Sequence, residues 1–318
     1  MKKKQKAQYR VRNWSQYNAA LVKRGSLEVW IDEEVLAKWK AQSKEQAEPG
    51  RPKVYSDCYI EMLLILGIKY DLTLREIEGF AGSLMKKMGI ELPIPDFSTL
   101  CRRKAKLEVQ VSKRKLAGAR VIAVDSSGVK VFGEGEWKVR QYGYSKRRTW
   151  RKIHLGVDTQ TGELVSAEGS TNDKSDDQML PKVLEGIDPD IQVAQVNGDG
   201  IYDRRRSYQS IKERGAKAVI PPRKGAKIWQ HGNAKAERLD RDNNLRRIRK
   251  IGKKAWKKES GYHQRSKAEN AMYRYKTLIG DTLSSRVEDN QMVEIKLGAK
   301  ALNILSSLGM PESFKVAA

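Results

Sequence analysis

The sequence predicts an α/β protein in which a mixed sheet flanked by helices follows an all-helical region. Three observations predict this class. Up to about residue 115 the chain reads as short, capped helices. From Ala117 onward, runs rich in Val and Ile alternate with polar residues, as strands do. Helical segments then separate further apolar runs, which favours a parallel continuation of the sheet. We therefore predict two domains, residues 1–115 and residues 116–318.

The helices expected in residues 1–115 have recognisable ends. Gly25 stops the first helix, Asp32 caps the second, and Thr73 with Glu76 forms a capping box. A polar stretch that contains Pro and Gly, residues 43–53, reads as a linker. The expected helices span residues 15–24, 32–41, 56–69 and 73–88, and a basic helix begins near residue 96.

The basic helix carries Arg102 and Arg103. A succession of short helices that ends in a basic one resembles a helix-turn-helix, in which flanking cations touch phosphates. We therefore predict that residues 1–115 bind DNA and that Arg102 and Arg103 contact it. The alternative is a helical domain with a solvated basic face.

Residues 116–318 begin with an antiparallel arrangement and continue with alternating helices and strands. A strand or hairpin is expected from Ala117, and two strands joined by a turn follow it. Residues 222–260 lose the pattern, are strongly basic, and read as an insertion that is partly helical at 239–250. The other expected strands span 150–158, 163–170, 191–199 and 217–222, and the other helices span 174–186, 203–215, 262–276 and 291–308.

The composition favours a nucleic-acid partner. The 318 residues carry a formal net charge of +24, which opposes compaction and attracts polyanions. A membrane surface is the second candidate, but we find no basic amphipathic anchor, signal peptide or membrane-spanning run. Cys58 and Cys101 lack metal-ligand spacing, which fits reduced thiols in the cytoplasm.

Two carboxylates stand where apolar strands end. Asp125 follows a Val-Ile-Ala-Val run, and Asp199 follows the apolar strand expected at 191–199. Functional groups gather at such ends in open α/β sheets. Taken alone, each acid fits a turn or N-cap residue better than a functional group. Asp203 reads better as a helix N-cap than as a ligand, and the acids at 173, 176 and 177 read as caps of the following helix.

The helix expected at 262–276 presents one acid among cations. At about 100° per residue, Glu269 shares a face with Tyr262, Arg265 and Lys276. A neighbouring apolar stripe, formed by Ala268, Met272, Tyr275 and Ile279, would pack on the sheet. A solvated charged face is the alternative, although such faces usually mix charges at i,i+4.

The three acids Asp125, Asp199 and Glu269 suit divalent metal ions. Mg²⁺ prefers oxygen ligands, mainly carboxylates, with substrate phosphate completing its coordination. Two such ions would activate an attacking hydroxyl or water and stabilise a leaving 3′ oxygen, while nearby cations hold the DNA backbone. We therefore predict that the three acids are both the catalytic residues and the metal ligands.

These residues resemble a known family. Tyr262, Arg265, Glu269 and Lys276 match the Tyr-(2)-Arg-(3)-Glu-(6)-Lys signature of bacterial insertion-sequence transposases of the DDE type. Asp125 and Asp199 would be the other two acids. The N-terminal stretch WSQYNAALVKRGSLEVW and the stretch GRPKVYSD extend the resemblance over most of the chain.

The resemblance implies a ribonuclease H-like catalytic domain and two Mg²⁺ or Mn²⁺ ions per active site. It also implies cleavage at transposon ends, followed by attack of the 3′-OH groups on target DNA. Tyr262, Arg265 and Lys276 would hold the terminal DNA, and the N-terminal domain would recognise the terminal inverted repeats. Because two ends must be paired, a homodimer or larger assembly on DNA is expected. The location would be the bacterial cytoplasm, in association with the nucleoid.

A second basic stretch, residues 137–152, interleaves cations with aromatic residues. Phosphate contact combined with base stacking uses this composition, and we predict DNA contacts at Lys146, Arg147 and Arg148. The alternative is a hairpin whose aromatic rings pack into the core.

Other functions fit parts of the pattern. A metal-dependent nuclease or junction resolvase would need the same acids but would not join DNA. A DNA-binding regulator would carry the acids only for structure, and a Glu269→Ala variant would then keep its function. A tyrosine recombinase is disfavoured, because no arginine and histidine constellation surrounds a candidate nucleophile.

Overall fold

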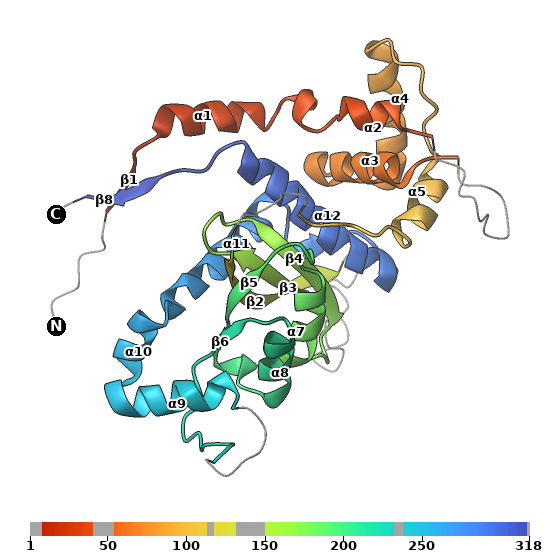
Figure 1. Ribbon diagram of the computed structural model, residues 1–318. Helices are drawn as coiled ribbons and strands as arrows, with labels where there is room; N and C mark the ends of the chain where they lie inside the picture. The colour runs from red at the N-terminus through yellow and green to blue at the C-terminus, as the bar shows by residue number, and fades with distance from the viewer. Residues whose placement is uncertain (1–7, 41–53, 113–117, 132–149, 232–237, 317–318) are drawn as a thin grey trace, which may run out of the picture.

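The structure, a computed structural model, describes residues 8–40, 54–112, 118–131, 150–231 and 238–316 (Figure 1). The N-terminal helices pack at one end of the molecule, and a six-stranded sheet lies in the other part. Helix α12 (Glu288–Ser307) runs between the two parts. Two segments from opposite parts of the sequence meet, because β1 (Tyr9–Val11) pairs antiparallel with β8 (Ser313–Lys315).

The N-terminal helices begin at the caps that the sequence predicts. Asp32 accepts hydrogen bonds from the backbone of Glu34 and Val35, and Thr73 forms its capping box with Glu76. The second helix is shorter than expected and ends at Ala37. The helices are α1 (Trp14–Lys23), η1 (Leu27–Val29), α2 (Glu33–Ala37), α3 (Asp57–Tyr70), α4 (Leu74–Lys87) and α5 (Phe97–Lys104). Since β1 precedes them, this region is mainly rather than wholly helical.

The sheet has the mixed character that the sequence predicts. Its strands are β2 (Arg120–Val131), β3 (Trp150–Asp158), β4 (Leu164–Thr171), β5 (Val193–Asn197) and β6 (Lys217–Val219). They lie in the order β4-β3-β2-β5-β6, and β7 (Thr282–Leu283) pairs with the far end of β2. The first three are antiparallel, whereas β5 and β6 run parallel to β2. This mixed α/β arrangement is consistent with a ribonuclease H-like fold.

Each face of the sheet packs against its own helices. Because strand side chains alternate, Ile122 and Val124 enter the core that α7 (Asp176–Glu185) and α8 (Arg205–Glu213) cover. Ala123 faces the opposite core, which α11 (Ser266–Leu278) and α12 cover. By the same alternation, Asp125 points to the α11 side of the sheet.

Helix α12 contributes to two cores. Val293 and Leu297 pack with the N-terminal helices, whereas Ile295 and Ala299 pack against the sheet. Such a helix must be apolar over most of its circumference. Even so, no helix in the described part of the chain, α12 included, has the length and apolar character needed to cross a membrane.

The basic segment 222–260 contains a helix at the expected place, α9 (Asp240–Ile251), and a second one that was not predicted, α10 (Lys253–Glu259). Helix α9 is docked on the sheet, where Arg241 Nε lies 2.8 Å from Asp203 Oδ1. The prediction that Asp203 caps the next helix is wrong, because Arg204 occupies that position. Burial explains the difference, since the Arg241 guanidinium needs a buried carboxylate partner.

Candidate active site

Asp125 and Asp199 lie at the same level of two neighbouring parallel strands. The register of β2 and β5 pairs Ala123 with Asn197, and each aspartate follows two residues later. The prediction that a strand ends at Asp125 is wrong, because β2 continues to Val131, and the Asp125 side chain is 21% exposed. Asp199 also caps a short turn, η2 (Gly200–Tyr202), by accepting a 2.8 Å hydrogen bond from the Ile201 backbone N–H. The cap interpretation of Asp199 is therefore correct, and it leaves the second carboxylate oxygen for another contact.

The third acid, Glu269, lies on the first turn of α11. The prediction of one continuous α-helix from residue 262 is wrong, because Tyr262–Arg265 forms a 3₁₀ turn, η3. The apolar stripe is confirmed, since Ala268, Met272 and Tyr275 are buried against the sheet. Their burial turns Glu269 toward solvent, with a side chain that is 53% exposed.

Polar side chains of the sheet hold the start of η3. Gln195 Nε2 donates to the Ser260 carbonyl at 3.1 Å, and Asn197 Nδ2 donates to the Gly261 carbonyl at 3.4 Å. Sequence reasoning missed both positions. The signal available in the sequence was Asn197, a polar residue at the end of an apolar strand. In the structure this residue is completely buried. A buried amide needs hydrogen-bond partners, and here those partners position the signature residues.

Arg265 bridges the acids. Its Nη1 lies 3.6 Å from Asp125 Oδ2, and its Nη2 donates to the Glu269 carboxylate one helical turn away. The Arg265 side chain is only 19% exposed, so these contacts are partly shielded from water. The structure thus brings the β2 acid and the α11 acid together through one guanidinium.

The electrostatic environment links all three acids. Burial raises the pKa of Asp125, the Ser126 backbone N–H and Arg265 lower it, and the charges of Asp199 and Glu269 raise it. The net direction is upward, because burial and like charges both disfavour the ionised form. Burial would lower the pKa of Arg265, but neighbouring Tyr262, Glu269, Asp125 and Asp199 outweigh it, so the pKa is raised. Direct contacts join Arg265 to Asp125 and Glu269, and Asp199 adds to the negative charge around Asp125.

The donor set suits a hard divalent cation, since all three groups supply carboxylate oxygens. In the described part of the chain, however, no three His, Cys, Asp or Glu side chains lie in an arrangement that could hold a metal ion. Arg265 contacts two of the three carboxylates instead. The chemistry of the donors fits a metal, and the side chains must rearrange to bind one.

The other two signature residues flank the acids. Lys276 Nζ donates to Ser127 Oγ at 2.6 Å, two residues beyond Asp125 on β2. The ring centroids of Tyr262 and Trp256 lie 6.0 Å apart, and Lys257 Nζ lies 4.8 Å from the Tyr262 centroid. Of these three residues, Arg265 contacts the carboxylates, whereas Lys276 is held against the strand that carries Asp125 and Tyr262 packs beside α10.

The remaining predicted DNA contacts lie elsewhere. Arg103 donates to the Tyr55 carbonyl at 2.9 Å and pairs with Asp57, so its side chain holds the start of α3. Arg102 is exposed on the same helix, α5. Lys146, Arg147 and Arg148 lie outside the described residues.

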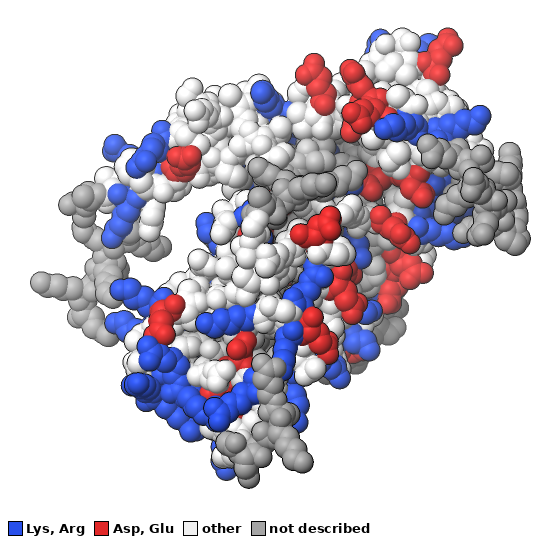
Figure 2. Space-filling model, in the orientation of Figure 1, with Lys and Arg blue, Asp and Glu red and all other residues white. Residues whose placement is uncertain are grey.

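A basic surface lies next to the site. Figure 2 shows Lys and Arg gathered at the lower edge of the molecule, where Figure 1 places α9 and α10. The exposed cations of this α9–α10 surface are Arg247, Arg249, Lys250, Lys253, Lys254 and Lys258. The contact between Lys257 and Tyr262 joins this surface to the signature residues. Its charge suits a phosphate backbone.

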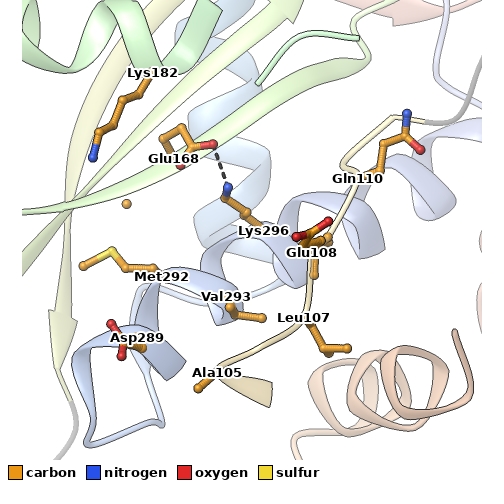
Figure 3. A pocket seen from close by; sticks show the side chains of 12 residues that line it. Ala105, Leu107, Glu108, Gln110, Glu168, Lys182, Asp289, Met292, Val293 and Lys296 are labelled. Carbon is orange, nitrogen blue, oxygen red and sulfur yellow. Dashed lines mark ion pairs between the residues drawn. The ribbon is translucent and has the colours of Figure 1, made fainter. Parts of the chain in front are cut away.

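A cavity of about 700 Å³ lies away from the acids, between α12, β4 and residues 105–110 (Figure 3). An ion pair of 2.7 Å between Lys296 and Glu168 crosses it, and Lys182 reaches it from α7. None of the three candidate acids lines it. The carboxylates beside Arg265, rather than this cavity, therefore remain the candidate site.

Comparison with known families agrees with this arrangement. A family model described as a transposase DDE domain matches residues 116–304, which is more than half of the chain and includes β2, β5 and α11. A second model with the same description matches residues 22–134. The match over the sheet and α11 covers the elements that carry Asp125, Asp199 and Glu269. The chain therefore belongs to the family of transposases with a DDE domain.

Proposed function

We propose that this transposase cuts the ends of a bacterial insertion sequence and joins the resulting 3′-OH ends to target DNA. The observation that supports this most directly is geometric: Arg265 contacts both Asp125 and Glu269, and Asp125 and Asp199 each follow a paired position of β2 and β5 by two residues. These acids come from two adjacent strands and one helix of a chain with transposase DDE domains.

In this proposal Asp125, Asp199 and Glu269 hold two Mg²⁺ or Mn²⁺ ions. When bound, the ions would supply activation of the attacking hydroxyl and stabilisation of the leaving 3′ oxygen. Lys276 and Arg265 position the scissile phosphate by charge-assisted hydrogen bonds, and Tyr262 offers an aromatic ring for stacking. The Ser127 hydroxyl holds Lys276 beside Asp125 and thereby directs that phosphate to the acids.

The DNA partner would extend beyond this site. We assign the terminal inverted repeats to residues 1–115, with Arg102 as the better placed of the two predicted α5 contacts because Arg103 pairs internally. Lys146, Arg147 and Arg148 remain proposed contacts. Two ends must be held together for joining, which requires a homodimer or a larger assembly on DNA in the nucleoid.

The test is a joining reaction. Purified protein is incubated with a labelled transposon-end duplex, a target plasmid and Mg²⁺. Joined product is expected with the unmodified protein, and none is expected with Asp125→Ala, Asp199→Ala or Glu269→Ala. Asp190→Ala, an exposed acid outside the site, serves as the matched control and should join normally.

The outcome separates the alternatives. Cleavage without joining would favour a metal-dependent nuclease or junction resolvase. A duplex that is bound but uncut by every variant would favour a DNA-binding regulator whose acids are structural.

A further inference from the structure

The candidate site contains a cation of its own. The Arg265 guanidinium lies 3.6 Å from Asp125 and donates to Glu269. It is one-fifth exposed, whereas the carboxylate of Glu269 is half exposed. One arginine therefore partly balances the charge of two of the carboxylates that the proposed function assigns to metal ions.

We propose that Arg265 is an internal counter-ion that leaves the carboxylates for a DNA phosphate when a divalent cation binds. This inference rests on the proposed function, because it assumes that Asp125 and Glu269 ligate the metal. It adds a role for Arg265 that is distinct from a permanent DNA contact, since one guanidinium serves two partners in turn.

The first reason is competition for the same oxygens. A divalent ion that takes Asp125 and Glu269 as ligands approaches the guanidinium that already contacts both, and the two cations repel each other. In the described residues the acids are also not arranged as a metal-binding group. At present Arg265 joins Asp125 to Glu269 by contacting both carboxylates. When Arg265 leaves them, both carboxylates are free to bind a metal ion.

The second reason is the chemistry of the released side chain. A guanidinium presents a planar fork of donors that matches a phosphate in a bidentate manner. Its backbone can stay in place, because Gln195 and Asn197 hold the residues just before η3. Rotation of the Arg265 side chain alone is therefore sufficient to exchange a carboxylate for a phosphate.

Lys276 provides a contrast within the same signature. Its ammonium group donates to the neutral Ser127 hydroxyl. It carries the same charge as Arg265, but neither of the ion pairs seen with Asp125 and Glu269 includes it. Removal of Lys276 should weaken DNA binding without freeing carboxylate oxygens, which makes it the matched control.

Exchange of this kind couples the two ligands. Metal binding frees Arg265 for phosphate, and phosphate binding frees the carboxylates for metal, by the same factor in both directions. We expect Arg265 to contribute a coupling of roughly tenfold, within the usual range for linked sites.

The experiment measures binding, not activity. Ca²⁺, which takes the same carboxylate ligands, is titrated into the protein by calorimetry, and the affinity for a labelled DNA duplex is measured by fluorescence anisotropy at constant ionic strength. The variants are Arg265→Gln, Lys276→Gln and Asp125→Asn. We expect Arg265→Gln to bind Ca²⁺ roughly tenfold more tightly, and Ca²⁺ to strengthen DNA binding roughly tenfold less in that variant. Lys276→Gln removes the same charge without freeing a carboxylate oxygen, so its gain in Ca²⁺ affinity should be clearly smaller than that of Arg265→Gln.

The outcomes distinguish this inference from the proposed function. If Asp125→Asn abolishes Ca²⁺ binding but Arg265→Gln leaves its affinity unchanged or weaker, the metal site stands and the counter-ion role is wrong. If none of the proteins binds Ca²⁺ in a manner that depends on Asp125, the metal site of the proposed function is wrong as well. Circular dichroism confirms that each variant is folded.

Discussion

At the scale of single residues, the three candidate acids are held to different degrees. Asp125 is largely buried within a strand, and Asp199 is fixed by the turn that it caps. Glu269 is half exposed and contacts Arg265 on its own helix. Because exposed side chains contribute little to folding, Glu269 is the acid whose functional role is most easily separated from a structural one.

We predict that Glu269→Gln folds normally but loses DNA joining. Glutamine keeps the size of the side chain and can accept a hydrogen bond from Arg265, but it lacks the charge that a metal ligand needs. Joining should fall about 10⁴-fold, the scale seen when one member of a catalytic unit is removed. Urea unfolding and the yield of joined product measure the two effects, with Glu185→Gln on α7 as the control. Joining at the normal rate would show that Glu269 is not catalytic.

At the scale of elements, the docking of α9 on the sheet sets the position of Tyr262 and Arg265. Arg241 is buried between Asp203 and the Trp229 ring, whose centroid lies 3.7 Å from the guanidinium carbon. Asn244 on the same helix donates to the Ala218 carbonyl of β6 at 2.9 Å. Since α10 follows α9 and leads directly into η3, these contacts set the position from which Tyr262 and Arg265 begin.

We predict that Arg241→Met destabilises the protein by about 3–5 kcal/mol, because the change leaves Asp203 buried without its charged partner. Urea denaturation measures the loss. Arg247→Met on the same helix is the control, and its loss should be much smaller, because Arg247 and Glu259 form an exposed ion pair. Equal losses in the two variants would mean that the buried pair does not dock α9.

At the scale of the whole molecule, α12 joins the helical region to the sheet. Lys104 of α5 lies 3.0 Å from Glu294 of α12, and both side chains are almost fully buried. Glu294 also accepts hydrogen bonds from the backbone of Ser284 and Ser285. This network ties α5, β7 and α12 together, so its loss should loosen both parts at once.

The network predicts a pH dependence of stability. Burial alone would raise the pKa of Glu294, but Lys104 and the hydrogen bonds from Ser285 and Ser284 outweigh it, so the pKa lies below the ordinary 4.5. The unfolded chain then binds the proton more readily than the folded chain. The stabilisation is therefore fully present above about pH 4.5 and is lost as the pH falls through the lower, folded pKa.

Glu294→Gln should consequently destabilise the protein at neutral pH by about 3–5 kcal/mol, because the buried Lys104 loses its charged partner and, among the described residues, keeps only the Ser285 hydroxyl. It should also lose less further stability than the unmodified protein between neutral and acid pH. Urea midpoints measured across that range test both statements. Glu288→Gln, an exposed acid on the same helix, is the control and should retain the normal profile. An unchanged profile in Glu294→Gln would contradict the assignment.

The basic character of the whole molecule predicts salt-dependent DNA binding. If the α9–α10 surface touches phosphates, Lys254→Gln should reduce the slope of log K against log salt by about 1. Anisotropy titrations at several salt concentrations measure the slope. Lys182→Gln, an exposed lysine on α7, should leave it unchanged. If Lys254→Gln also leaves the slope unchanged, the DNA binds to a surface other than the α9–α10 surface.

The sequence by itself determined the features that depend on near neighbours. Helix starts at Asp32 and Thr73 were predictable, because a cap bonds to residues two or three positions away. The strands and the apolar stripe of α11 were predictable, because alternation and helical periodicity repeat within a few residues. Asp199 after its strand and the four residues at 262, 265, 269 and 276 stood out for the same reason, whereas Asp125 lies in the interior of β2 rather than at its end. The family match agrees with the resemblance that these residues suggested.

The tertiary structure alone decided which distant groups meet. The register of β2 and β5 sets Asp125 level with Asp199, and the 3₁₀ turn brings Arg265 between Asp125 and Glu269. The pairing of Asp203 with Arg241 joins residues 38 positions apart, and no local pattern predicts it. Such contacts depend on how whole elements pack, because burial selects partners by shape and charge across the fold rather than by distance along the chain.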